Sequence, residues 1–106
     1  MEPEIIEKYK NRFSSLEEIL RESNFAGASN ISTELVRVSE FLDIPELVFI
    51  GEFFESLFDN LKEIDMLFDF DQEIKNELNT KILSLINIIR SSIPFEVYYN
   101  KRRFCI

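Results

Sequence analysis

Residues 33–62 read TELVRVSEFLDIPELVFIGEFFESLFDNLK, and the expected fold follows from this stretch. On both sides of the connector DIPE at 43–46, large apolar side chains recur every three or four residues, which is the spacing of one buried helix face. Asp43 is a candidate N-cap for the second of these helices, and Pro45 suits a first helical turn. The stretch predicts two helices whose short connection makes them pack antiparallel.

The two predicted helices differ in how clearly the sequence marks their ends. The earlier one ends at Leu42, and either Asn24 or Ser29 could be its N-cap. Its apolar positions at heptad-like spacing, which should face the core, are Ile31, Leu35, Val38 and Leu42. The opposite face then holds Thr33, Val36, Arg37 and Glu40. The later helix should fade near Asp65, and the segment MLFDF at 66–70 should be a connector.

Two further amphipathic segments flank this pair. One runs over about residues 3–22 and the other over about 72–92, with Asp71 as its N-cap and Pro94 beyond its end. Helices joined by short connections pack against their neighbours in alternating directions. The sequence therefore predicts one all-α domain, an antiparallel up-down four-helix bundle over residues 1–94.

The last residues, 95–106, read FEVYYNKRRFCI and differ from the rest. Phe95, Val97 and Tyr99 alternate as in a strand, and Asn100 could begin a turn. We therefore expect a separate basic and aromatic C-terminal tail, either an ordered appendage or the start of a further segment.

Charge and composition exclude several classes of function. Residues 1–95 carry 19 acidic and 9 basic groups, so nucleic acid and anionic membranes are not expected partners. The chain has no histidine and one cysteine, Cys105, so we expect no metal and no cofactor. The N-terminus lacks the apolar core of a signal peptide, and no apolar run approaches the length of a membrane span. These features predict a cytoplasmic protein.

Residues 33–47, TELVRVSEFLDIPEL, resemble the motif H-x-L-K-G-S-A-x-x-L-G-x-x-E-L of histidine phosphotransfer (Hpt) domains, including those of chemotaxis histidine kinases. The positions that match in kind are Leu35, Leu42, Glu46 and Leu47. The residues FESL at 54–57 stand where the family has L-E-x-L, which aligns Glu55 with the family's glutamate. The resemblance implies an Hpt-like four-helix bundle.

The departures from the motif concern the chemistry. Thr33 stands at the position equivalent to the phosphoacceptor histidine, Val36 replaces the lysine, and Arg37 replaces the glycine. A threonine hydroxyl stays protonated near neutral pH and would need a general base, and the chain has no histidine to supply one. Phosphotransfer through histidine is therefore impossible, and we expect no enzyme activity.

The resemblance implies a degenerate, non-phosphorylatable Hpt-like binding module in two-component or chemotaxis phosphorelay signalling. Its partner would be a receiver (response-regulator) domain or a histidine kinase domain. The expected docking surface comprises Ile31, Val36, Arg37, Glu40 and Glu55. Three of the singled-out residues also have a plainer interpretation: Glu55 as a solvated or helix-pairing carboxylate, Val36 as a scattered surface residue, and Thr33 as an ordinary surface threonine.

A second hypothesis is a structural or oligomerisation bundle with no signalling role. Phe49 falls outside the main apolar stripe of its helix, so a homodimer could bury Phe49 or Val36. The acidic run DFDQE at 69–73 lacks the glycine and the distal glutamate of a calcium loop, and helix capping explains its aspartates better.

Overall fold

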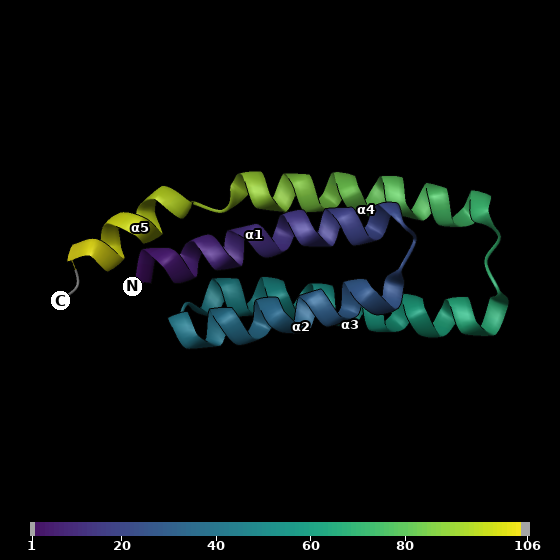
Figure 1. Cartoon of the computed structure of the whole chain (residues 1–106), viewed down its shortest axis with the longest axis horizontal. Coiled ribbons are helices and arrows are strands. Elements are labelled where there is room, and N and C mark those ends of the chain that lie inside the picture. Colours follow the sequence, from purple (N-terminus) through teal and green to yellow (C-terminus); the bar gives the residue numbers. More distant parts are fainter. Residues whose placement is uncertain (1, 105–106) are drawn as a thin grey trace.

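The computed structural model describes residues 2–104, and it describes side-chain burial for residues 4–99. This part of the chain forms five helices and no strand: α1 (Glu2–Arg21), α2 (Phe25–Leu42), α3 (Pro45–Phe68), α4 (Gln72–Ser92) and α5 (Phe95–Phe104). The four long helices run back and forth along a molecule of 51 × 20 × 17 Å (Figure 1). The predicted all-α class and bundle of four long helices are confirmed.

Side-chain caps begin α2 and α4 where the sequence indicates them. The Asn24 side chain accepts a hydrogen bond from the Gly27 N–H at 2.8 Å, which identifies Asn24 rather than Ser29 as the cap of α2. The Asp71 side chain accepts from the Ile74 N–H at 2.9 Å. Helix α4 ends at Ser92, two residues before Pro94.

The predicted N-cap at Asp43 is wrong. Asp43 adopts a left-handed conformation, with φ 56° and ψ 46°, and its N–H bonds the Glu40 carbonyl at 3.1 Å, so it terminates α2. Ile44 is the N-cap of α3 and has no side-chain capping bond. The connection is so short that Asp43 must reverse the chain, while Ile44 is buried in the core. Pro45 does occupy the first turn of α3.

Helix α3 does not end near Asp65 but continues to Phe68, so most of the expected connector is helical. The Asp65 carboxylate accepts a hydrogen bond from the Phe70 N–H at 3.1 Å, and Asp69 closes the helix in a left-handed conformation. The aspartates of the DFDQE run therefore serve helix ends, as the capping interpretation predicted.

The strand-like alternation of the C-terminal tail is misleading, because residues 95–104 form helix α5. Phe95 is buried and its ring lies 6.5 Å from that of Tyr9 on α1. Val97 is exposed, whereas the Tyr99 hydroxyl donates a hydrogen bond to Glu7 of α1. The segment thus packs onto the bundle as a fifth helix.

Aromatic residues from α1 and α3 fill the centre of the bundle. Tyr9, Phe13, Phe54 and Phe58 are fully buried. The Tyr9 and Phe13 ring centroids lie 5.5 Å apart, and Phe13 and Phe54 lie 6.2 Å apart, both edge to face. The Tyr9 hydroxyl donates a 2.9 Å hydrogen bond to the Leu47 carbonyl, which satisfies a buried polar group and ties α1 to α3.

The bundle is closed on three sides. Helix α1 packs against α2, α4 and α5, and α2 packs against α3. In the described chain, no Cα atom of α3 comes within 8 Å of a Cα atom of α4. An ion pair joins these two helices near their connection, where Lys75 Nζ lies 3.7 Å from Asp65 Oδ2. No helix among the described residues has the length and apolar character to cross a membrane.

Candidate functional site

The residues singled out by the sequence meet at the middle of the α2–α3 interface. The Thr33 hydroxyl lies 2.6 Å from Glu55 Oε2, to which it donates a hydrogen bond, and 3.2 Å from the Ser29 carbonyl. Both side chains are half-buried. Thr33 and Glu55 are therefore neighbours across the interface, and Glu55 is a helix-pairing carboxylate.

A second hydroxyl–carboxylate pair lies one helical turn away. The Ser29 hydroxyl donates a hydrogen bond to Asp59, and Lys62 Nζ lies 4.0 Å from the same carboxylate. The sequence analysis considered Ser29 only as a cap and did not single out Asp59. A signal was present, because hydroxyls at positions 29 and 33 and carboxylates at 55 and 59 share a four-residue spacing.

Gly51 allows α2 and α3 to approach closely beside the Thr33–Glu55 pair. A Cβ atom on Gly51 would lie 3.0 Å from the Val36 backbone nitrogen and 3.1 Å from Val36 Cγ2. Gly51 is buried, and Val36 is half-buried against it rather than fully open to solvent. This close approach brings the short Thr33 side chain within reach of Glu55.

The other residues of the expected docking surface separate into two groups. Arg37 and Glu40 are exposed on the same side of α2 as Thr33. Ile31 is half-buried and packs against the core, because two residues turn an α-helix by about 200°. The structure therefore separates Ile31 from the expected surface, and the remaining residues, Val36, Arg37, Glu40 and Glu55, lie beside Thr33.

The chemistry of this arrangement is that of a hydrogen-bonded contact between helices. A carboxylate that accepts from a hydroxyl could orient it or take its proton, and a nucleophilic role would also need donors or cations that stabilise the charge developing in the transition state. Lys62 lies beside Asp59, and the exposed Arg37 lies one helical turn from Thr33 on α2. Among the described residues, no group of three or more His, Cys, Asp or Glu side chains could hold a metal ion.

No protein-family model matches the chain, and comparison with curated proteins and with solved structures gives no match either.

Proposed function

We propose that this chain is a non-phosphorylatable, Hpt-like binding module of phosphorelay or chemotaxis signalling, which docks a receiver or histidine kinase domain. The observation that carries the proposal is the 2.6 Å hydrogen bond between Thr33 and Glu55. This bond joins Thr33, at the position equivalent to the phosphoacceptor, to Glu55, which the resemblance aligns with the glutamate of the Hpt motif. The two residues lie on two packed helices.

The docking surface of this proposal consists of Thr33, Val36, Arg37, Glu40 and Glu55. Arg37 and Glu40 are exposed and carry opposite charges, so they can set the orientation of a partner. Thr33 engages Glu55 through its hydroxyl. The mechanism is occupancy of the partner's surface, with no phosphate passing through the module.

Titration of the isotope-labelled protein with receiver domains from the same genome tests this function. We expect amide shifts centred on Thr33 and Arg37, and roughly fivefold weaker binding for Arg37→Glu. Lys81→Glu makes the same charge change at an exposed position of α4 and should bind like the wild type. Absence of binding across receiver and kinase domains would reject the docking function.

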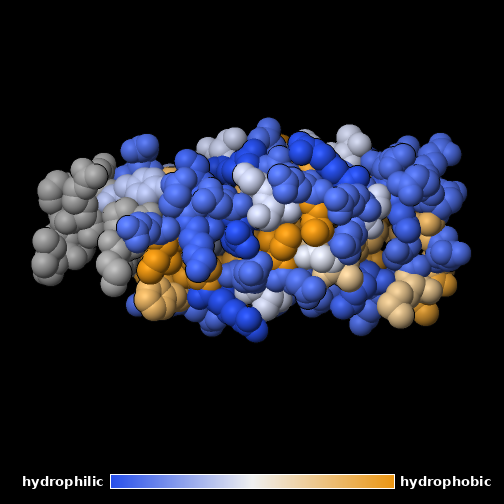
Figure 2. All heavy atoms as spheres, viewed as in Figure 1, coloured by the Kyte–Doolittle hydropathy of each residue, from blue (hydrophilic) through white to orange (hydrophobic). Residues whose placement is uncertain are grey.

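The second candidate is a structural or oligomerisation bundle, and it has an observation of its own. At the end of α3, Met66, Leu67 and Phe68 are 80%, 80% and 73% exposed. Figure 2 shows hydrophobic side chains gathered at that end of an otherwise largely hydrophilic face. Sedimentation at high micromolar concentration should then give a dimer that Leu67→Lys dissociates, whereas a monomer would contradict self-association.

A further inference from the structure

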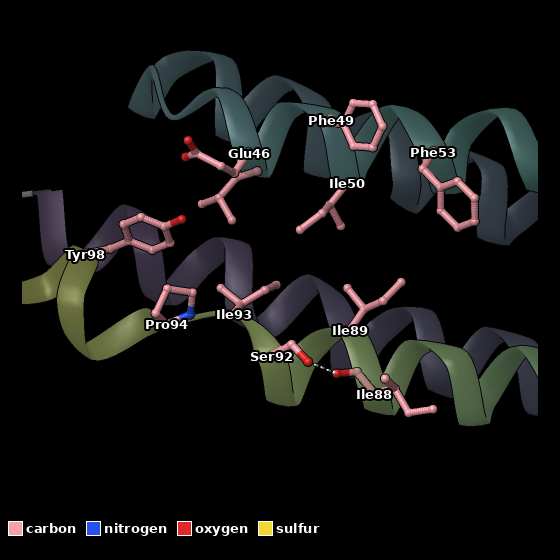
Figure 3. A pocket seen from close by; sticks show the side chains of 11 residues that line it. Glu46, Phe49, Ile50, Phe53, Ile88, Ile89, Ser92, Ile93, Pro94 and Tyr98 are labelled. Atoms are coloured by element: carbon pink, nitrogen blue, oxygen red, sulfur yellow. Dashed lines mark hydrogen bonds between the residues drawn. The ribbon is translucent and has the colours of Figure 1, made fainter.

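The open side of the bundle, between α3 and α4, holds an apolar groove of about 610 Å³ (Figure 3). Its α3 wall consists of Glu46, Leu47, Phe49, Ile50 and Phe53. Its opposite wall, from α4 and the start of α5, consists of Ile88, Ile89, Ser92, Ile93, Pro94 and Tyr98. In Figure 3 the side chains of Ile89 and Ile93 point into the opening toward Ile50 of α3. We call this feature the α3–α4 groove.

Large apolar side chains at the rims of the α3–α4 groove remain in water. Phe49 is 73% exposed, Phe53 is 43% exposed and Ile88 is 61% exposed. The one hydroxyl in the α4 wall is already satisfied, because Ser92 donates a 2.8 Å hydrogen bond to the Ile88 carbonyl. A contiguous apolar surface of this kind on a monomer marks an interaction site.

The charged groups around the groove are acidic. Glu46 lines it at the end where Tyr98 lies, and burial, then this neighbouring carboxylate, raises the pKa of the Tyr98 phenol. A shallower depression that shares Phe49 is lined by Glu40, Asp43 and Glu52. Among the side chains described for residues 4–99, no lysine or arginine lines either hollow. A ligand whose charge complements this rim carries lysine or arginine side chains.

The walls also determine which backbone conformation can bind. Both walls are helices, whose peptide groups bond within the helix, so the groove offers no row of free donors and acceptors to an extended peptide. An α-helix satisfies its own backbone and needs only apolar anchors. Residues 46–53 of α3 span about 10 Å, which is two helical turns and accommodates anchors at i, i+3 or i+4, and i+7.

We propose that the α3–α4 groove binds an amphipathic α-helix of another protein, with large apolar anchors on one face and lysine or arginine beside them. The anchors fill the space between Ile50 and Ile89, and the basic side chains lie against Glu46 at the groove and Glu52 in the adjoining depression. The bound helix closes the fourth side of the bundle. The groove shares no lining residue with the docking surface around Thr33, and Phe53 and Glu55 are about 200° apart around α3, although the depression beside the groove includes Glu40 of that surface.

Charge argues against two other occupants. Each chain carries a net charge of −8, so two copies joined groove to groove would bring their acidic rims together. An anionic lipid surface would meet the same repulsion. A basic helix is instead attracted by the acidic side chains that repel these two occupants.

The probe for this site is a synthetic helical peptide of about 18 residues, acetylated and amidated, with leucines on one face and lysines at the flanks. Two comparison peptides have glutamates in place of the lysines, or the same composition scrambled so that no apolar face exists. Binding is followed by fluorescence anisotropy, and the site is mapped by labelling isoleucine methyl groups. We expect the basic amphipathic peptide to shift Ile50, Ile88, Ile89 and Ile93 and the comparison peptides to bind at least about tenfold more weakly.

Matched variants distinguish binding in the α3–α4 groove from nonspecific binding to exposed apolar side chains. Phe49→Ser should weaken binding about tenfold, whereas Phe41→Ser, at a 71% exposed phenylalanine of α2, should change it less than about twofold. Glu46→Gln with Glu52→Gln should reduce both the affinity and its salt dependence. Glu18→Gln with Glu22→Gln, which makes the same charge change at exposed residues in α1 and just beyond its end, should not.

Several results would overturn the proposal. They are methyl shifts that map away from the groove, equal effects of the two serine variants, and equal binding of the basic and acidic peptides. A dimer of the free protein that Phe49→Ser dissociates would assign the groove to a second copy instead. Failure of all three peptides to bind would also reject it, whatever the receiver-domain titration shows at Thr33.

Discussion

At the scale of single residues, Thr33 has a structural partner. Its hydroxyl bonds Glu55 on α3 at 2.6 Å and the Ser29 carbonyl within α2 at 3.2 Å. A hydrogen bond to a charged group contributes about 1.5–3 kcal/mol to stability. In this half-buried setting the contribution is no larger than that, because water competes for both partners. Thr33 therefore helps to fix the contact between two helices.

A double-mutant cycle measures this contact. Thr33→Val and Glu55→Ala should each lower the free energy of unfolding, and the cycle should give a coupling energy of about 1 kcal/mol. The measurement is urea denaturation of the wild type, both single variants and the double variant. Thr80→Val, which removes an exposed hydroxyl bonded within α4, is the control and should be nearly neutral. Additive effects of Thr33→Val and Glu55→Ala would mean that the two side chains do not interact in solution.

At the scale of helices, the α2–α3 spacing depends on Gly51. Alanine is the better helix former by about 1 kcal/mol, but its Cβ would meet the Val36 backbone at 3.0 Å. A backbone atom cannot move aside without separating the helices, so overpacking should exceed the propensity gain.

We therefore expect Gly51→Ala to destabilise the protein by about 1–2 kcal/mol, as measured by thermal and urea unfolding. Ser56→Ala, at an exposed position of the same helix, should be neutral or slightly stabilising. A Gly51→Ala variant as stable as Ser56→Ala would show that α2 and α3 are not so tightly apposed.

Helix α5 is part of the same packing unit as α1. Phe95 is 8% exposed, its ring lies tilted at 55° to that of Tyr9, and the Lys10 ammonium lies 5.6 Å from its centroid. Phe95→Ala should cost about 3 kcal/mol because it leaves a cavity at the α1–α5 contact. Val97→Ala, at a position 57% exposed, should cost well under about 1 kcal/mol. Equal, small effects would indicate that residues 95–104 behave as a detached tail.

At the scale of the whole molecule, tyrosines make stability sensitive to alkaline pH. Burial, followed by the nearby Tyr98, raises the pKa of Tyr9 above its ordinary value of 10.0. Burial and the hydrogen bond to Glu7 raise the pKa of Tyr99 to about 12. Above about pH 10 the unfolded chain loses phenol protons that the folded protein retains, so the free energy of unfolding must fall as the pH rises.

Denaturant titrations at a series of alkaline pH values test this dependence. Tyr9→Phe should cost about 1 kcal/mol at neutral pH, where the bond to Leu47 is lost, yet it should make the alkaline loss of stability shallower. Tyr99→Phe should leave the contribution of Tyr9 in place. If the slope above pH 10 is the same with and without Tyr9, its phenol titrates freely in the folded state.

The local pattern of the sequence was a good guide to the long helices and a poor guide to their junctions. Helix α4 and its caps depend on contacts within a few residues, and they could be predicted from Asp71 and Pro94. The prediction of Asp43 as an N-cap is wrong because its left-handed conformation, which ends α2, follows from where α2 and α3 must pack. The strand-like prediction for residues 95–99 is wrong because contacts with Tyr9 and Glu7, which are distant in sequence, determine which of these side chains face inward.

The candidate site divides in the same way. The Hpt resemblance singled out Thr33 and Glu55, which the structure joins by a hydrogen bond, but the sequence missed the Ser29–Asp59 pair and grouped Ile31 with residues on the other side of α2. A hydrogen bond between helices depends on rotation and axial shift of both, and neither follows from periodicity in one helix.

The sequence by itself determined the helical class, the acidic character and the absence of any histidine chemistry, because each follows from residue identity and spacing along the chain. Only the tertiary structure decided which apolar faces are covered. Helix α2 covers α3 on the side of Gly51, while Ile50 and Ile89 face each other across an open groove. That outcome depends on the volumes and crossing angles of helices far apart in sequence, which compete for the same core.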